Sequence, residues 1–203
     1  MIIIGIVGSP AGGKSTVAKI LWELGATWIN ADLIARSVLE ESEFQERLLD
    51  HFGGSIQGSD LKIDRTKLAA AVFGSDDRSQ ANLNFLQSVI HPETKKRIAA
   101  KIDEATEMKS PAIALEVPLL FESKWDLVCD EIWCVDAPSN RRILWAKSRN
   151  WTQEDLKNRE SNQLPLFSKK QRSNFVIMND GDIYKLRAIV TDRLATLIPK
   201  TDA

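Results

Sequence analysis

The sequence is poor in cysteine and contains no long apolar run. Only two of its 203 residues are cysteines, Cys129 and Cys134, which are too few for a disulfide framework or a four-ligand zinc site. This scarcity favours a reducing compartment, and we expect the protein in the cytoplasm. No stretch approaches the ~18 to 20 consecutive apolar residues that span a bilayer, and the first residues do not form a signal peptide.

An excess of charge of either sign is also missing. Lysine and arginine total 27, aspartate and glutamate total 28, and the formal net charge is -1. Such a chain has no global field that would attract nucleic acid or an anionic membrane, so we expect neither as a partner. With 43% hydrophobic and 27% charged residues the composition is that of a globular protein, and the length suits a single domain.

The sequence does contain a regular alternation of apolar, β-branched runs with helical patterns. Strands are expected at residues 2–7, 27–30, 112–117, 131–135 and 175–178. The first run is apolar throughout, which is typical of a strand buried on both faces of a parallel sheet. The alternation predicts an α/β fold with a parallel sheet of about five strands flanked by helices.

The strongest chemical signal is a P-loop pattern between the first strand and the first helix. Gly8 and the triplet Gly13-Lys14-Ser15 have the required spacing in the required context. In such a loop backbone N–H groups bind phosphates, the lysine reaches the β and γ phosphates, and the serine hydroxyl binds magnesium. The pattern predicts a P-loop NTPase fold that binds ATP and Mg²⁺ through Ser9, Pro10, Ala11, Gly12, Gly13, Lys14, Ser15 and Thr16. The structural alternative is a Gly-rich turn with an incidental lysine.

P-loop proteins include small-molecule kinases, GTPase switches and ATP-driven machines, and no well-placed Asn-Lys-x-Asp string supports a GTPase here. Two long intervals between strands resemble the acceptor domain and the lid of a small-molecule kinase. We expect one kinase domain with its core at 1–32, 110–140 and 174–203, a helical acceptor-binding insertion at 33–109 and a lid at 141–173.

Two features inside these intervals give structural expectations. His91 is expected to end one helix and Pro92 to start the next, because proline suits the first turn of a helix. The lid pattern is polar and basic, with Lys169, Lys170 and Arg172 near its end, and suits a mobile segment that closes over ATP.

Two acidic residues stand at the ends of expected strands. Ligands of doubly wound sheets bind at the carboxyl ends of the strands, where Asp32 and Glu116 are expected. Asp32 there can orient an acceptor hydroxyl and take its proton, although it can also be an N-cap for a helix from Leu33. Glu116 can act on Mg²⁺ through water, as the acidic residue of other P-loop proteins does.

Five strings together resemble the dephospho-CoA kinase family in order and spacing over nearly the whole chain. They are GSPAGGKST at 8–16, NADLIAR at 30–36, HP at 91–92, EVPLLFE at 116–122 and NDG at 179–181. The second and fourth are much more specific than the generic P-loop. The resemblance implies that ATP, with magnesium, phosphorylates the ribose 3′-hydroxyl of dephospho-CoA, which is the last step of coenzyme A biosynthesis. We expect a monomer or a weak oligomer.

The resemblance also implies roles for single residues, each with a structural alternative. Asp32 matches the catalytic base, and the residues implied to bind the acceptor are Asp32, Arg36, His91, Pro118 and Leu119. Asn179 and Gly181 match the loop that borders adenine, but can equally form a simple turn. Arg36 can be a solvated arginine, His91 a buried hydrogen-bonded histidine, and Pro118 with Leu119 ordinary core packing.

The lid is where the sequence departs from the family pattern. The family usually has an arginine at the position of Trp145 and a glutamine at the position of Arg142, whereas Arg149 matches. On a helix these three residues share one face. Arg142 and Arg149 are therefore catalytic candidates for a phosphate contact, and Trp145 is expected to stack on adenine or on another arginine. The structural alternative is that Trp145 packs in the core and that Arg149 alone faces the nucleotide.

A second departure is Asn30, where the family often has aspartate, so that one negative charge near magnesium is missing. Two other functions stay open. One is a different small-molecule P-loop kinase, and the other is a non-catalytic nucleotide-binding protein in which the altered lid has abolished transfer.

Overall fold

The computed structural model describes residues 1–74 and 76–198. These residues form two compact units: Met1–Asn30 together with the chain from Ile102 onward, and Ala31–Lys101. Residue 75 of the expected insertion and residues 199–203 of the expected core lie outside the described residues. Each unit is described by itself below.

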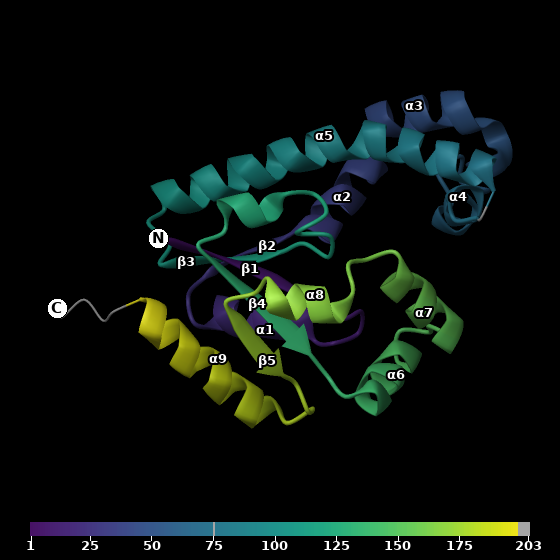
Figure 1. Ribbon diagram of the computed structural model, residues 1–203. Helices are drawn as coiled ribbons and strands as arrows, with labels where there is room; N and C mark the ends of the chain where they lie inside the picture. Colours follow the sequence, from purple (N-terminus) through teal and green to yellow (C-terminus); the bar gives the residue numbers. More distant parts are fainter. Residues whose placement is uncertain (75, 199–203) are drawn as a thin grey trace. The chain divides into compact units, whose positions relative to one another are not determined.

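The first unit contains a five-stranded, all-parallel sheet in the order β2-β3-β1-β4-β5 (Figure 1). Its strands are β1 (Ile2–Gly8), β2 (Thr27–Asn30), β3 (Ala112–Glu116), β4 (Glu131–Asp136) and β5 (Phe175–Met178). The α/β class and all five predicted strands are confirmed, although β1, β3 and β4 end one residue away from the expected position. Short apolar runs fix the existence of a strand better than its last residue.

Helices α1 (Lys14–Glu23) and α9 (Ile183–Leu197) pack together on one face of this sheet. Because strand side chains alternate between the two faces, every second residue of β1, β3, β4 and β5 enters this core. The buried strand residues are Ile4, Ile6, Ala112, Ala114, Trp133, Val135 and Ile177. They contact Val17, Ile20 and Leu21 of α1 and Leu186, Val190 and Leu194 of α9.

The other side of β1 and β4 is covered by α8 (Leu166–Gln171) and by the segment after β3, which includes the short 3-10 helix η2 (Trp125–Val128). A Cβ atom at Gly5 would lie 2.7 Å from Cys129 Sγ and 2.8 Å from Leu120 Cδ1. The central strand therefore needs a glycine at this point, because the covering side chains approach its backbone.

The strand order reverses at β1. The chain runs from β1 to β2 on one side, returns through β3, and then builds β4 and β5 on the other side. In open α/β sheets ligands bind beside the carboxyl ends of the strands at such a reversal. The fold thus places the loop between β1 and α1 at the expected binding position.

Between β4 and β5 the chain forms α6 (Ser139–Lys147), α7 (Gln153–Ser161) and α8. Helix α7 begins with a capping box in which the Thr152 side chain accepts from the Asp155 N–H and the Asp155 side chain accepts from the Thr152 N–H. The threonine and the acidic first turn thus define the start of this helix.

The second unit is helical. It comprises α2 (Ala31–Glu40), α3 (Ser42–Phe52), the 3-10 helix η1 (Gly53–Ile56), α4 (Arg65–Val72) and most of α5 (Asp77–Glu107). Its core consists of Val38, Phe44, Leu48, Ile56, Leu68, Val72, Val89 and Ile90. Asp64 caps α4, since its side chain accepts from the N–H groups of Thr66 and Lys67. Arg97 adds a forked contact to the two carboxylate oxygens of Glu41 at 2.5 and 2.7 Å.

The expectation of two helices that meet at Pro92 is wrong. Helix α5 is continuous over 31 residues with Pro92 inside it. Interior proline costs about 3 kcal/mol, because it removes one backbone hydrogen bond. Here the buried face continues across it through Ile90, Thr94 and Ile98, and the Thr94 hydroxyl donates to the Ile90 carbonyl at 2.8 Å. Continuous burial of this face therefore outweighs the local preference of proline.

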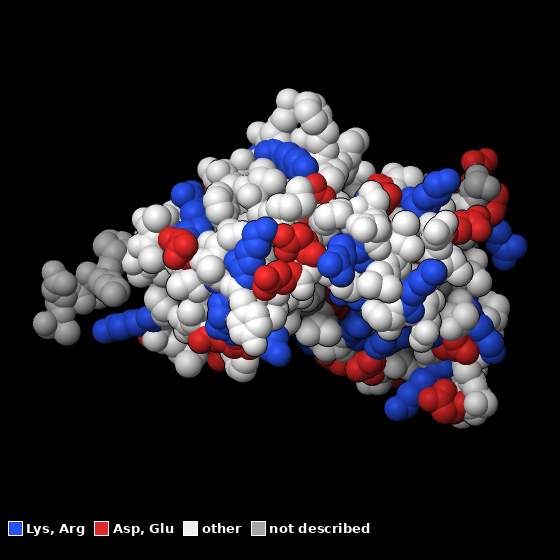
Figure 2. Space-filling model, turned by 90° about the horizontal axis from the view of Figure 1, so that it is seen from below, with Lys and Arg blue, Asp and Glu red and all other residues white. Residues whose placement is uncertain are grey.

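Positive and negative side chains intermingle over the face that Figure 2 shows, as the balanced composition suggests. Among the helices that the structure describes, none combines the length and the apolar character needed to cross a membrane.

A substitution at the end of β1 tests how tightly the sheet constrains the loop that follows. Gly8 has φ of 138°, and a Cβ there would lie 1.9 Å from the Val135 carbonyl oxygen. We expect Gly8→Ala to lower the free energy of unfolding in urea by more than ~2 kcal/mol, because backbone atoms must move. The matched variant is Gly54→Ala, whose Cβ meets nothing within 4 Å. Equal stability of both variants would contradict this description.

Candidate active site

The loop between β1 and α1 is held open by glycines at both ends. Gly13 caps α1 with φ of 97°, and a Cβ there would lie 2.1 Å from Asn179 Nδ2. Asn179, which follows β5, is buried and donates through Nδ2 to the Gly12 carbonyl at 3.1 Å. It therefore fastens the loop after β5 to the P-loop. The N–H groups at the start of α1 and the helix dipole together favour an anion at this position.

The Lys14 side chain folds back over the loop. Its Nζ donates to the carbonyl oxygen of Ser9 at 2.9 Å and to that of Gly8 at 3.2 Å. The lysine is thus held within the curve of the P-loop, where its charge can act on a phosphate.

The Glu116 carboxylate joins α1 to the end of β2. Glu116 is 5% exposed, and its Oε1 accepts from the Ser15 hydroxyl at 2.6 Å. Its Oε2 accepts from Asn30 Nδ2 at 2.8 Å and from Trp28 Nε1 at 3.2 Å. Three donors from two elements therefore fix this carboxylate, as a buried charged group requires. The two residues predicted as metal-site residues, Ser15 and Glu116, lie in direct contact.

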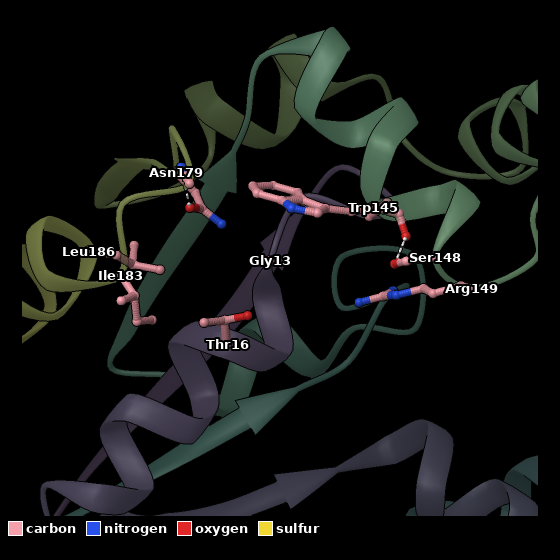
Figure 3. A pocket seen from close by; sticks show the side chains of 10 residues that line it. Gly13, Thr16, Trp145, Ser148, Arg149, Asn179, Ile183 and Leu186 are labelled. Atoms are coloured by element: carbon pink, nitrogen blue, oxygen red, sulfur yellow. Dashed lines mark hydrogen bonds between the residues drawn. The ribbon is translucent and has the colours of Figure 1, made fainter.

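A cavity of about 230 Å³ opens beside the P-loop (Figure 3). Its lining joins the loop, the segment after β5 and the end of α6, and consists of Ala11, Gly13, Thr16, Trp145, Ser148, Arg149, Asn179, Gly181, Ile183 and Leu186. The Trp145 indole lies over Gly13, with Asn179 on one side and Ser148 on the other. A Cβ at Gly181 would lie 3.4 Å from the Arg141 guanidinium and 3.5 Å from the Trp145 ring, so both side chains lie beside the loop after β5.

A second cavity, of about 180 Å³, lies beside the first part of the loop. Ser9, Pro10, Arg142, Glu160 and Lys169 are among its lining residues. Arg142 forms an ion pair with Glu160 and donates through Nε to the Ala137 carbonyl at 3.2 Å. The expected common face of Arg142, Trp145 and Arg149 is wrong, because α6 ends at Lys147 and Arg149 lies beyond it. Arg142 and Arg149 consequently line different cavities.

The comparisons with a family model and with curated proteins agree on one family. The model of the dephospho-CoA kinase family matches residues 2–185. The chain belongs to this family. A curated dephospho-CoA kinase of Rhodopirellula baltica is 40% identical over 97% of this chain and 91% of its own length. One of Carboxydothermus hydrogenoformans is 38% identical over 98% of this chain and 93% of its own.

A solved structure shares the fold of this chain. The crystal structure of TT1252 from Thermus thermophilus is 33% identical, covers 97% of both chains and superposes with a TM-score of 0.80. The resemblance to the dephospho-CoA kinase family, the P-loop fold and the assignment as a kinase that uses ATP are confirmed.

Three residues that the family resemblance implies for the acceptor lie in the helical unit. Asp32 is the second residue of α2, so the alternative of an N-cap before Leu33 is wrong, since the helix already starts at Ala31. Arg36 is exposed on the same helix. His91 lies on the exposed surface of α5 and not in the core. Neighbouring atoms still cover part of its ring, and this desolvation, together with the charge of Lys95, lowers its pKa. Pro118 and Leu119 belong to the first unit, where they are half-buried in the turn after β3.

The basic end of the lid pattern is engaged with the core. Lys170 Nζ lies 2.6 Å from Asp136 Oδ2, and Arg172 lies 3.1 Å from Asp126 Oδ2. Lys169 is only 2% exposed. From the sequence, a short basic segment suggests a solvated helix face. The ion pairs with Asp136 and Asp126 could not be predicted, because these partners lie far away in the sequence.

Sequence reasoning missed Trp28 and Trp151. Trp28 donates to Glu116, but on a β-strand it suggests only core packing. The guanidinium carbons of Arg159 and Arg149 lie 4.0 and 5.5 Å from the centre of the Trp151 ring. These cation–π contacts stabilise the segment that carries Arg149. The spacing of Trp151 and Arg159 in the sequence is the feature that could have indicated their cation–π contact.

The two cysteines lie in surroundings that disfavour the thiolate form. Burial raises the pKa of Cys129 to about 12 and that of Cys134 to about 11. Both thiols are therefore protonated at neutral pH and are poor nucleophiles.

A substitution in the cavity beside Trp145 tests whether this cavity binds the base of a nucleotide. If the base of a nucleotide stacks on Trp145, we expect Trp145→Ala to raise the Kd for ADP about tenfold, since stacking on an aromatic ring contributes ~1–3 kcal/mol per base. Calorimetric titration measures this Kd. Trp22→Phe is the control, because Trp22 is 56% exposed on α1. Unchanged ADP binding by Trp145→Ala would place the base elsewhere.

Proposed function

We propose that the protein transfers the γ-phosphoryl group of ATP to the ribose 3′-hydroxyl of dephospho-CoA and releases coenzyme A and ADP. The observation that carries this proposal is the joint arrangement of the P-loop, the Ser15–Glu116 contact and the adjoining cavity in a chain of the dephospho-CoA kinase family. Family membership supports the acceptor, and the P-loop supports the donor.

The nucleotide has one orientation that uses both features. Its base occupies the cavity of about 230 Å³, which Trp145, Asn179 and Gly181 line. Its phosphates then lie over the N-terminus of α1, within reach of Lys14 and of the backbone N–H groups from Ala11 to Thr16. Thr16 lines the cavity at the border between base and phosphates.

The residues present fit a magnesium ion. A hydroxyl and a carboxylate are the oxygen donors that Mg²⁺ prefers, and Mg²⁺ keeps several waters beside phosphate oxygens. Ser15 would bind the ion directly, and Glu116 would hold Ser15 and a bound water. Residues 1–74 and 76–198 contain no group of three acidic, histidine or cysteine side chains that could hold a metal alone. When bound, the ion neutralises charge that develops on the phosphates.

Asp32 is proposed as the base. It stands two residues after Asn30, the last residue of β2, so covalent connectivity keeps the two Cα atoms within ~8 Å of each other. A carboxylate there orients the acceptor hydroxyl and takes its proton as the bond to phosphorus forms. The same unit carries Arg36 and His91, which we propose bind the acceptor, together with Pro118 and Leu119 of the turn after β3.

The two lid arginines have different proposed tasks. Arg142 lines the cavity at Ser9 and Pro10 and is proposed to stabilise charge on the transferred phosphoryl group. Arg149 lines the cavity of the base and is proposed to contact the phosphates from that side. The cytoplasmic location and the monomeric or weakly oligomeric state stay predictions.

Mass spectrometry of reactions with magnesium and ATP tests the proposal. Dephospho-CoA, AMP and shikimate are offered in parallel, and we expect dephospho-CoA alone to gain a phosphoryl group. Asp32→Asn should bind ATP and dephospho-CoA normally but lose ~10²- to 10⁴-fold in kcat, because only proton transfer and orientation are removed.

Asp192→Asn is the matched control, since Asp192 is exposed on α9. Wild-type kcat in Asp32→Asn would exclude Asp32 as the base while leaving the reaction intact. Phosphorylation of AMP or shikimate in place of dephospho-CoA would identify a different small-molecule kinase. Nucleotide binding without any transfer would support a non-catalytic protein.

A further inference from the structure

One buried cation near the P-loop has no part in the mechanism above. Lys169 of α8 is 2% exposed, and its pKa is lowered by burial. Burying an ammonium group is costly, so a lysine is retained at such a position only when its donors are used. Its Nζ donates to Gln163 Oε1 at 2.6 Å and to the Gly8 carbonyl oxygen at 3.5 Å.

The Gly8 carbonyl is therefore shared by two lysines. Lys14 Nζ donates to it at 3.2 Å from α1, and Lys169 Nζ approaches it from α8. Two ammonium groups held at one oxygen repel each other, and this repulsion favours the departure of the one that has another partner available. In a P-loop the other partner of Lys14 is the β and γ phosphates of the nucleotide.

We propose that Lys169 is a positioning residue that keeps the Gly8 carbonyl hydrogen-bonded while Lys14 moves from it to the phosphates. This inference rests on the proposed nucleotide site. A buried carbonyl that loses its donor destabilises the state in which it is unpaired. Lys169 therefore stabilises the nucleotide-bound loop rather than the empty one, and Gln163 holds its ammonium group in place.

Two features of the fold support this arrangement. Helix α8 packs on β1 and β4, so Lys169 approaches Gly8, the last residue of β1, from a fixed element. The Glu122 carboxylate accepts from the Leu164 N–H at 2.7 Å, which fastens the segment that leads into α8. The charge of Glu122 also favours the protonated form of Lys169.

The test compares nucleotides that differ in their contact with Lys14. Lys169→Met keeps the length of the side chain and removes its donors. We expect its Kd for ADP and for ATP to rise about tenfold, which corresponds to ~1.4 kcal/mol. Its Kd for AMP should stay within roughly twofold, because AMP lacks the β and γ phosphates that draw Lys14 away. Lys169→Arg should restore much of the affinity for ADP.

Thermal unfolding without nucleotide separates this role from a merely structural one. The Tm of Lys169→Met should equal or exceed that of the wild type. The substitution removes a buried cation, which destabilises the fold, while Lys14 still donates to the Gly8 carbonyl in the nucleotide-free protein. Lys157→Met is the matched control, because Lys157 is exposed on α7. If Lys169→Met does not fold, Gln163→Leu asks the same question, and it should weaken ADP binding without affecting AMP.

Three results would overturn the proposal. The first is an unchanged Kd for ADP in Lys169→Met, and the second is an equal rise of the Kd for AMP and for ADP. The third is a rise of the Kd for ATP alone, which would mean that Lys169 contacts the γ-phosphate directly. Because the titrations contain no acceptor, they are independent of whether dephospho-CoA is the substrate. Failure of the wild type to bind ADP would instead refute the proposed nucleotide site itself.

Discussion

The site depends on the hydrogen bonds that converge on the Glu116 carboxylate. This group lies at the carboxyl end of β3 and accepts from Ser15 on α1 and from Trp28 and Asn30 on β2. A carboxylate that is 5% exposed requires such donors, since an unpaired buried charge strongly destabilises a fold. Its contacts therefore hold the start of α1 against β2 and β3. Because the P-loop leads directly into α1, they also fix the end of the P-loop. The P-loop and the proposed metal site therefore take their positions from this junction.

Much of this arrangement could be predicted from the sequence, because it follows from local rules. The spacing of Gly8, Gly13 and Lys14 specifies a loop between a strand and a helix, and apolar β-branched runs specify the five strands. Strands alternating with helices imply a parallel sheet, and the ends of neighbouring parallel strands lie at one edge. That rule was sufficient to place Glu116 near Ser15 and to single out Asp32. Strings such as EVPLLFE then carried the family assignment that the comparisons confirm.

The remaining features depend on contacts between distant residues, which local rules do not reach. Pro92 suggested a helix boundary, yet the buried face of α5 continues through it. Lys169 belongs to a basic stretch that suggested a solvated lid, but Gly8, more than 150 positions earlier in the chain, accepts from it. Arg142 and Arg149 were expected on one helical face, and the early end of α6 sends them to different cavities. Asn30 stands where the family often has an aspartate, and its amide donates to the Glu116 carboxylate, a contact between distant residues that the sequence pattern did not indicate.

The most direct test of the account is the effect of magnesium on ADP binding in Glu116→Gln, measured by calorimetric titration beside the wild type. The substitution preserves the size of the side chain and removes its charge. The account predicts that Mg²⁺ tightens ADP binding in the wild type and that this gain falls about tenfold or more in the variant, as for residues that orient metal ligands. An equal gain from Mg²⁺ in both proteins would contradict the account, because the junction at Glu116 would then have no part in holding the metal and the nucleotide.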